Sequence, residues 1–259
     1  MLGDIYMDMG LKGKNAIICA SSRGLGKGCA KALASEGVDL VINGRDQEVL
    51  SSTANEIRNE FNIKVIEFCA DITSKDSQSK LLEICPAPDI LVNNAGLMRR
   101  GDITNTSDDD YEMSMAINVE APFRIVRSII PLMSNAGGGS IVNVSSCWGI
   151  NPGPNHLIYC TTKAALATMT KCLGRDHAHQ NIRINAVCPN EVNTPMLRTG
   201  FEIRGLDSND AINELNQSVP IGHIAEPEEI ADVITFLTSN EARYICGSLV
   251  EINGGKAVY

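Results

Sequence analysis

The sequence predicts an α/β protein in which one parallel sheet carries helices on both of its faces, a doubly wound arrangement. Short β-rich runs alternate with longer helical patterns, about seven such runs occur, and several of them are apolar without a period of two. Alternating strands and helices form parallel sheets through right-handed crossovers. Continuous apolar runs such as Asp89-Ile90-Leu91-Val92 suit strands that are covered on both faces.

The predicted strands are short and lie at fairly even intervals along the chain. They are Asn15–Ala20, Asp39–Asn43, Lys64–Cys69, Asp89–Asn93, Ser140–Ser145, Arg183–Cys188 and Ser248–Ile252.

Helical patterns fill most of the intervals, at Gly26–Glu36, Gln47–Phe61, Tyr111–Met133, His156–Ala178 and Pro227–Thr238. About seven strands in 259 residues indicate a single domain over residues 1–259. The longest stretch without an assigned element, Asn193–Gly222, is rich in Thr, Asn, Asp and Gly. Such a stretch within a compact domain is usually a functional loop, and we interpret it as a substrate flap.

Composition excludes several classes of protein. A net charge of -9 argues against a nucleic-acid partner, and no apolar run approaches the roughly 20 residues that span a membrane. Residues 1–10 lack the basic start of a signal peptide. The nine cysteines without CxxC spacing predict neither a disulfide framework nor a zinc site, so we expect a reducing, cytoplasmic setting. His177 and His179 are two residues apart and point in different directions on a helix, so no metal site is predicted.

The first predicted strand runs into a loop of small residues that a helix follows, Cys19-Ala20-Ser21-Ser22-Arg23-Gly24-Leu25-Gly26. Small residues allow the backbone to approach a pyrophosphate, whose charge the N-terminus of the helix then stabilises. The expected cofactor contacts in this loop are Ser22, Arg23, Gly24, Leu25 and Gly26. A plain turn remains the alternative interpretation.

The end of the second predicted strand indicates which dinucleotide is bound. An NAD-specific site usually has an acidic residue here to hold the ribose 2′-hydroxyl, but this chain has Gly44 and Arg45. Arg45 and Arg23 together suit a 2′-phosphate. The sequence therefore favours NADP(H) over NAD(H), unless both arginines are ordinary surface residues.

Two further strand ends are predicted to reach the cofactor. Asp71 and Ile72 follow the third strand and are placed to touch the adenine, although Asp71 is equally suited to cap a helix. The run Asn93-Asn94-Ala95-Gly96 ends the fourth strand at the same edge, where ligands bind in open α/β sheets. A bland turn is the alternative there.

Tyr159 and Lys163 form a YxxxK motif at the start of a predicted helix, and their spacing places the phenol and the ammonium on one face. A free tyrosine has a pKa near 10, and lowering it by ~3 units takes about 4 kcal/mol. A neighbouring ammonium and a positively charged nicotinamide could supply that stabilisation, so we expect a lowered pKa for Tyr159.

Ser146 ends the predicted fifth strand, where its hydroxyl could hydrogen-bond a substrate oxygen while Tyr159 exchanges the proton. Ser145 is the competing choice. Asn118 lies within a predicted helix, where asparagine is intrinsically unfavourable. Holding a water or bending the helix would explain it, and a solvent-facing side chain is the alternative.

Taken together, these motifs resemble the short-chain dehydrogenase/reductase family in its compact, single-domain, Rossmann-type branch, from the phosphate loop to Asn253-Gly254-Gly255. The resemblance implies a catalytic tetrad of Asn118, Ser146, Tyr159 and Lys163. It also implies that Lys163 holds the nicotinamide ribose, that Asn94, Val192 and Thr194 position the cofactor, and that the chain forms a homotetramer, or a dimer, through its two long helices.

Three residues depart from the pattern of that family. Ala20 replaces the first glycine of the phosphate loop, which costs on the order of 1 kcal/mol if the position has a positive φ. Asn190 replaces the usual glycine after Pro189, and Glu191 follows it near the expected substrate pocket. These departures put the substrate in doubt rather than the chemistry.

The substrate is the least determined part of the prediction. The chain resembles 3-oxoacyl-carrier-protein reductases and sugar or polyol dehydrogenases, but a net charge of -9 would repel an acidic carrier protein, even with Arg175 available. A polar set is expected at the pocket mouth and favours a small hydroxylated substrate; it comprises Arg99, Arg100, Trp148, Asn155, His156, Asn190 and Glu191.

Two other functional classes remain as alternatives. A catalytically silent NADP(H)-binding scaffold or sensor would have no need for Tyr159 together with Lys163. A nucleotide-sugar epimerase or dehydratase can share that pair but usually adds a C-terminal substrate domain, for which little chain follows the last predicted strand.

Overall fold

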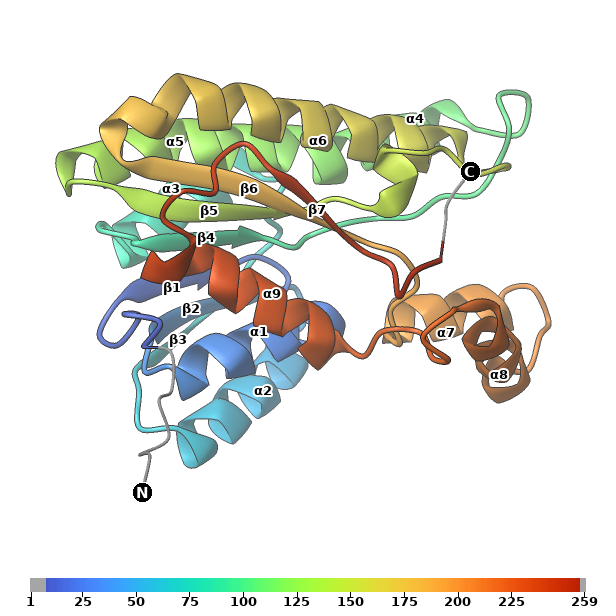
Figure 1. Cartoon of the computed structure of the whole chain (residues 1–259), viewed down its shortest axis with the longest axis horizontal. Helices are drawn as coiled ribbons and strands as arrows, with labels where there is room; N and C mark the ends of the chain where they lie inside the picture. The colour runs from blue at the N-terminus through green and yellow to red at the C-terminus, as the bar shows by residue number, and fades with distance from the viewer. Residues whose placement is uncertain (1–7, 257–259) are drawn as a thin grey trace.

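The computed structural model describes residues 8–256 and confirms the predicted seven-stranded parallel sheet (Figure 1). Most of the N-terminal extension, residues 1–10, lies outside the described residues. The strand order is β3-β2-β1-β4-β5-β6-β7. The strands are β1 (Asn15–Ile18), β2 (Asp39–Gly44), β3 (Val65–Cys69), β4 (Ile90–Asn93), β5 (Gly139–Val144), β6 (Ile182–Pro189) and β7 (Leu249–Ile252).

Helices cover both faces of the sheet (Figure 1). One face carries α1 (Gly24–Ser35), α2 (Gln47–Glu60) and α9 (Pro227–Thr238). The other carries α3 (Lys75–Ile84), α4 (Asp108–Met115), α5 (Ala121–Asn135) and α6 (Leu157–His177). Two short helices, α7 (Pro195–Glu202) and α8 (Ser208–Ser218), project beyond the sheet at its carboxyl edge.

The apolar strands lack a period of two because both faces of the sheet are buried. In β1, Ile17 and Ile18 point to opposite faces, belong to different hydrophobic clusters, and are both fully buried. They pair with Val41 and Ile42 of β2 in parallel register. The strand order reverses between β1 and β4, and parallel α/β sheets bind ligands beside such a point.

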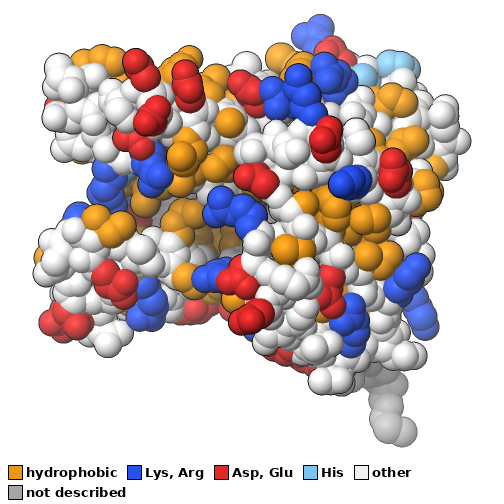
Figure 2. All heavy atoms as spheres, turned by 180° about the vertical axis from the view of Figure 1, so that it is seen from behind, with side chains coloured by type: hydrophobic (Ala, Val, Ile, Leu, Met, Phe, Trp, Pro, Cys, Tyr) orange, Lys and Arg blue, Asp and Glu red, His pale blue; other side chains and the backbone are white. Residues whose placement is uncertain are grey.

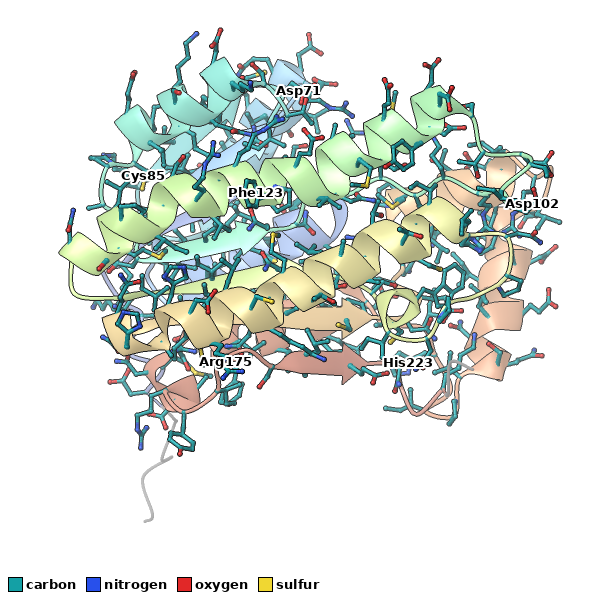
Figure 3. The ribbon with its side chains drawn as sticks, turned by 90° about the horizontal axis from the view of Figure 1, so that it is seen from above. Asp71, Cys85, Asp102, Phe123, Arg175 and His223 are labelled. Carbon is teal, nitrogen blue, oxygen red and sulfur yellow. The ribbon has the colours of Figure 1, made fainter. Side chains whose placement is uncertain are left out.

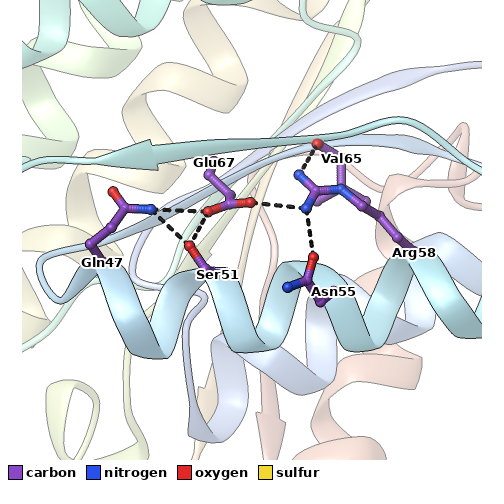
Figure 4. Close-up of polar contacts among 6 residues, drawn as sticks. All are labelled: Gln47, Ser51, Asn55, Arg58, Val65 and Glu67. Carbon is purple, nitrogen blue, oxygen red and sulfur yellow. Dashed lines mark hydrogen bonds and ion pairs between the residues drawn. The ribbon is translucent and has the colours of Figure 1, made fainter.

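Polar contacts fasten the edge strand β3 to α2 (Figure 4). The Glu67 carboxylate accepts hydrogen bonds from Ser51 and from Gln47, the latter at 3.0 Å. Arg58 donates to the second oxygen of Glu67 at 2.9 Å and to the Val65 carbonyl at 2.7 Å. This cluster fixes the edge of the sheet next to the loop that carries Asp71.

The structure differs from the sequence prediction in three places. The predicted helix Tyr111–Met133 is interrupted by one π-helical turn, Ala116–Glu120, between α4 and α5. The helix α3 was not predicted. The stretch Asn193–Gly222, predicted without regular elements, contains α7 and α8. Among residues 8–256 no helix is both long and apolar enough to span a membrane.

Candidate active site

A cleft of about 720 Å³ opens at the carboxyl edge of the sheet and brings together most of the predicted site residues. Its lining includes Ser22, Arg23, Gly24, Leu25, Arg45, Asp71, Ile72, Asn94, Ala95, Gly96, Ser145, Ser146, Tyr159, Lys163, Val192 and Thr194. Gly26 and Asn118 do not line the cleft, but each contacts residues that do.

The phosphate loop contains a residue in the left-handed region. Ala20 has φ +54, where a Cβ atom costs on the order of 1 kcal/mol, and its N–H donates to Asn43 Oδ1 at 3.2 Å. Gly26 faces this turn so closely that a Cβ would lie 2.2 Å from the Ala20 carbonyl oxygen. Gly26 therefore allows α1 to pack against the loop, and the loop itself presents Ser22 to Leu25 to the cleft.

The N-terminus of α1 fits a bound pyrophosphate. Its N-cap, Arg23, makes no side-chain capping hydrogen bond, and its first turn contains no acidic residue. The backbone N–H groups of this turn are therefore free of side-chain partners, and the helix dipole favours an anion there. A dinucleotide phosphate meets both conditions.

Two guanidinium groups stand at the corner where the 2′-phosphate of NADP(H) is expected. Arg23 and Arg45 both line the cleft, and the Arg23 Nη2 lies 3.8 Å from the Asp46 carboxylate. The side chain of Arg23 remains more than half exposed. Such a weak, exposed ion pair leaves the guanidinium available to a ligand.

Asp71 uses its carboxylate locally. Its Oδ1 accepts hydrogen bonds from the Thr73 N–H at 2.9 Å and the Thr73 hydroxyl at 2.8 Å. These hydrogen bonds, together with the charge of Arg45, hold the pKa of Asp71 below its usual value. Asp71 thus shapes the turn before α3, whose N-cap is Ser74, while it lines the cleft with Ile72.

Asn94 and Gly96 connect the two halves of the site. The Asn94 amide donates to the Ala20 carbonyl at 2.9 Å and so ties the loop after β4 to the phosphate loop. A Cβ on Gly96 would lie 3.3 Å from Lys163 Nζ and 3.6 Å from Asn118 Oδ1. Gly96 therefore leaves room for both side chains to approach this loop.

Tyr159 and Lys163 lie on the same side of α6 and both line the cleft. Lys163 is 3% exposed, its Nζ donates to the Val144 carbonyl at 2.7 Å, and it lies 5.9 Å from the centre of the Tyr159 ring. Tyr159 is half-buried. The helical spacing thus brings the phenol and the ammonium together as the sequence predicts.

Burial acts on the pKa of Tyr159 in addition to the two charges considered from the sequence. Burial raises the pKa of this phenol above its usual value, and a hydrogen bond with Ser146 opposes the rise. Burial also lowers the pKa of Lys163 to about 8. Burial therefore favours the neutral form of the Tyr159 phenol, whereas the charges of Lys163 and of a bound nicotinamide would favour the phenolate.

The two neighbouring serines face different partners. The Ser145 hydroxyl donates to the Lys163 backbone carbonyl at 2.8 Å and is buried. The Ser146 hydroxyl accepts from the Trp148 N–H at 3.2 Å and interacts with the Tyr159 phenol. The geometry favours Ser146 over Ser145 as the hydroxyl that can meet a substrate oxygen beside Tyr159.

Asn118 lies in the π-helical turn and is completely buried, so it is not a solvent-facing residue. Its Oδ1 accepts from the Leu97 N–H at 2.8 Å, and its Nδ2 donates to the Leu97 carbonyl at 2.8 Å and to Thr162 Oγ1 at 2.9 Å. Asn118 therefore clamps the loop after β4 against α6. π-helical turns are frequent at functional sites because they redirect side chains in this way.

The far side of the cleft contains the two other departures from the family pattern. Asn190 and Glu191 both line the cleft, and Glu191 pairs with Lys256 at 2.8 Å. Val192 forms an isolated bridge with Ala225, which holds this segment beside the start of α9.

The predicted pocket mouth is only partly correct. Four of its seven residues line the cleft, namely Arg100, Trp148, Asn190 and Glu191. Arg99 instead forms an ion pair with Asp110, with 2.8 Å between Nε and Oδ1, and Asn155 is exposed. His156 is buried, and its ring centre lies 4.1 Å from that of Trp148. Among the described residues there is no cluster of three or more metal-binding side chains.

Several lining residues were missed by the sequence analysis. They include Met98 and, from the stretch around α7 and α8, Met196, Leu197, Phe201, Arg204 and Leu215. The only sequence signal for the latter group was the composition of Asn193–Gly222.

Comparisons with known proteins extend over almost the whole chain. A family model described as enoyl-(acyl-carrier-protein) reductase matches residues 19–257. A 3-oxoacyl-[acyl-carrier-protein] reductase of Aquifex aeolicus (strain VF5) is 32% identical over 96% of this chain and 99% of its own. The likeness is therefore not confined to the phosphate loop.

Solved structures show the same extent of similarity. The L-sorbose reductase of Gluconobacter frateurii, complexed with NADPH and L-sorbose, has a TM-score of 0.93 and 32% identity, covering 98% of this chain and 100% of its own. A 3-ketoacyl-(acyl-carrier-protein) reductase of Brucella melitensis, complexed with NADH, has a TM-score of 0.83 and 28% identity, covering 95% and 99%.

Proposed function

Because the chain belongs to the short-chain dehydrogenase/reductase family, we propose that it transfers a hydride between NADP(H) and the carbonyl or alcohol carbon of a small polar substrate. It is an NAD(P)-dependent oxidoreductase that acts on CH–OH or C=O groups. The observation that carries the proposal is the convergence of the Tyr159 phenol, the Ser146 hydroxyl and the Lys163 ammonium in one cleft.

Different residues along the cleft would bind different parts of the dinucleotide. The first turn of α1 would hold the pyrophosphate, and Arg23 and Arg45 would hold the 2′-phosphate. Lys163, Asn94, Val192 and Thr194 would hold the nicotinamide end. When bound, the nicotinamide supplies or accepts the hydride.

Tyr159 acts as the acid in carbonyl reduction. A neutral phenol can donate its proton to the carbonyl oxygen as negative charge develops there, and positioned proton transfer contributes typically 10²–10⁴-fold to a rate. The Ser146 hydroxyl can donate a hydrogen bond to the same oxygen. Burial raises the pKa of Tyr159, which favours the protonated phenol that carbonyl reduction needs.

Lys163 and Asn118 support that proton transfer from the interior. The Lys163 ammonium stabilises negative charge on the phenol oxygen once the proton has left. Asn118 holds the Leu97 backbone, and with it the loop against which Lys163 packs. Lys163 thus stabilises the phenolate electrostatically, and Asn118 is a positioning residue.

A small polar substrate is supported by the lining on the open side of the cleft, where Arg100, Asn190 and Glu191 are polar. The similar L-sorbose reductase binds a neutral ketose. Activity as a 3-oxoacyl-[acyl-carrier-protein] reductase is a second candidate, favoured by the names of similar proteins. Against it, a net charge of -9 disfavours docking of an acidic carrier.

A homotetramer built on α5 and α6 belongs to the same proposal, with a dimer as its smaller form. These helices run side by side on one face of the molecule, where α5 carries Phe123 (Figure 3). Phe123 is 50% exposed, and Tyr111, Met113 and Leu157 expose apolar surface on the adjoining helices. An interface along these helices would cover those exposed apolar side chains.

The proposal extends to a cytoplasmic location and to the flap. All nine cysteines are free thiols, as expected in a reducing compartment. Residues 193–222 would act as the substrate flap because they place Phe201 and Leu215 on the cleft.

The test is turnover of a panel of ketoses, polyols and acyl thioesters, followed by nicotinamide absorbance with NADPH and NADH in parallel. We expect reduction of a polar ketone with a preference for NADPH, and a loss of at least 10²-fold in kcat for Tyr159→Phe. Tyr244→Phe is the matched control, because Tyr244 is 99% exposed and lies outside the cleft.

Three results would contradict parts of this proposal. Equal turnover by Tyr159→Phe would remove the phenol from the chemistry and favour a scaffold or sensor. A preference for NADH would overturn the role of Arg23 and Arg45. Activity confined to acyl thioesters would replace the polar substrate by the acyl-carrier candidate.

A further inference from the structure

Two arginines line the cleft from segments that are distant in the sequence. Arg100 follows the Asn94–Gly96 loop at the end of β4, and Arg204 lies in the connection between α7 and α8. Neither belongs to the corner formed by Arg23 and Arg45. On the face shown in Figure 2, Lys and Arg side chains border the hollow whose interior is largely apolar.

Both arginines lie towards the tyrosine end of the cleft. Gly101, the neighbour of Arg100, forms an isolated bridge with His156. Burial, and then the charges of Arg100 and Arg204, lower the pKa of the His156 imidazole. His156 packs on Trp148 at 4.1 Å, and the Trp148 ring meets the Tyr159 ring edge-on at 6.3 Å. The pair therefore stands beside the expected position of the substrate.

Both arginine side chains are exposed, and local contacts hold the backbone beside Arg100 and one nitrogen of Arg204. The Gly101 N–H donates to the Asn155 carbonyl at 2.9 Å and the Gly101 carbonyl accepts from Leu157, which holds Arg100 against the start of α6. Arg204 donates from Nε to the Gly200 carbonyl at 3.0 Å, and its guanidinium lies over the Phe201 ring. Its two terminal nitrogens remain for a ligand.

The charges of this pair are not balanced within residues 8–256. No carboxylate of these residues lies within ion-pair distance of Arg100 or Arg204. The carboxylates that line the cleft are Asp46, Asp71 and Glu191. The first two belong to the cofactor corner, and Lys256 neutralises Glu191 at 2.8 Å.

Two like charges near one cavity repel each other. Burial lowers the pKa of Arg100, and the charge of Arg204 lowers it further. An anion placed between them would remove this repulsion and accept paired hydrogen bonds from the planar guanidinium groups.

We propose that Arg100 and Arg204 form an anion subsite, so that the carbonyl substrate carries a carboxylate or a phosphate at the end that lies away from Tyr159. This inference rests on the proposed function, because it takes the carbonyl to lie at Tyr159. It narrows the small polar substrate to an anionic one.

Three ketones of the same carbon chain test the subsite: L-sorbose, its derivative with a carboxylate in place of the C6 hydroxymethyl group, and L-sorbose 6-phosphate. With NADPH, we expect at least one of the two anionic ketones to exceed L-sorbose tenfold or more in kcat/KM. Whether the carboxylate or the phosphate is preferred identifies the anion.

Matched variants locate that preference. Arg100→Gln and Arg204→Gln should each lower the anionic-to-neutral ratio of kcat/KM at least tenfold, mainly through KM for the anionic ketone. Arg99→Gln should leave the ratio within twofold, because Arg99 pairs with Asp110 and does not line the cleft. Equal kcat/KM for the neutral and anionic ketones, or an equal loss in all three variants, would overturn the subsite.

Calorimetric binding to Tyr159→Phe in the presence of NADPH separates this inference from the proposed function. Tighter binding of an anionic ketone that is lost in Tyr159→Phe/Arg100→Gln supports the subsite even where the wild-type protein turns over none of the three. Turnover of ketones without any preference for an anion keeps the proposed function and removes the subsite. Absence of binding by all three ketones likewise contradicts it.

Discussion

Lys163 and Arg23 line the same cleft, and the protein holds their charges in different surroundings. Lys163 is 3% exposed, and its ammonium donates to the Val144 carbonyl at 2.7 Å. The Arg23 side chain is 58% exposed, and its nearest carboxylate, on Asp46, lies 3.8 Å away. One charge is fixed within the core, whereas the other reaches out from a loop.

The difference follows from what each charge is proposed to do. Proton transfer needs a donor within hydrogen-bond reach in a fixed geometry, and a low-dielectric site strengthens the charge that assists it. Recognition of a phosphate needs only a guanidinium that can reach the ligand, and the ligand itself then orders the side chain. Substitutions at the two ends of the cleft should therefore differ in kind.

The largest effect is expected for Lys163→Met. Removal of the ammonium leaves Tyr159 without the charge that stabilises its phenolate, so we expect kcat to fall on the order of 10²-fold or more. Lys171→Met is the matched control, since Lys171 is an exposed lysine on the same helix. If both variants kept wild-type turnover, the interior charge would have no part in the chemistry.

The same variant should change how stability depends on pH. The pKa of Lys163 is lowered from 10.5 to about 8 in the folded protein, so its charged form weakens the fold below pH 8. This penalty fades as pH rises from 8 to 10.5, because the folded state has lost a proton that the unfolded chain still binds. The Tm of Lys163→Met relative to wild type should accordingly be highest near pH 7 and fall towards pH 10. A difference in Tm that is constant over this range would show that Lys163 is not desolvated.

An intermediate effect is expected at the exposed end for Arg23→Gln/Arg45→Gln. Loss of charge-assisted hydrogen bonds of about 1.5–3 kcal/mol each should raise the Kd for NADPH by at least about tenfold, with Kd for NADH within threefold. Because these charges are exposed, the wild-type preference for NADPH should shrink as salt is added. Fluorescence titration measures the Kd for NADPH and for NADH at each salt concentration. An equal loss of affinity for NADPH and NADH would mean that the arginines do not bind the 2′-phosphate.

The smallest effect is expected for Ala20→Gly in the phosphate loop. Ala20 has φ +54, so glycine should relieve roughly 1 kcal/mol of backbone strain, partly offset by the greater freedom of the unfolded chain. We expect a rise in Tm of up to a few degrees, with the Kd for NADPH within twofold. A lower Tm would show that the greater freedom of glycine in the unfolded chain outweighs the relieved strain.

The sequence predicted the buried strands and helices better than the helices that bury few side chains. The strand bounds agree within two residues, and the bounds of α9 agree completely, because buried apolar runs bounded by turns give a strong signal. The helices that were missed bury few side chains: α3 buries Gln78 and Leu81, α7 Phe201, and α8 Ile212. A helix with so few buried positions has almost no periodic signal.

In the candidate site too, residues placed by local geometry were predicted better than residues placed by tertiary packing. The spacing of Tyr159 and Lys163 on one helix predicted their placement together, because local geometry determines it. Arg204 could not be identified, since its place beside Arg100 depends on how residues 193–222 fold against the sheet. The effect of burial on the pKa of Tyr159 was missed for a related reason, because burial depends on the packing of the whole domain rather than on the motif.

In the proposed mechanism Tyr159 donates its proton as a neutral phenol beside a charged Lys163. The most direct measurement is kcat/KM for carbonyl reduction by NADPH between pH 6 and 10, which reports the ionisations of the free enzyme. We predict a plateau at low pH and a fall above about pH 8, where Lys163 loses its proton. A kcat/KM that stays level to pH 10, or rises with pH, would show that proton donation by Tyr159 does not depend on a charged Lys163.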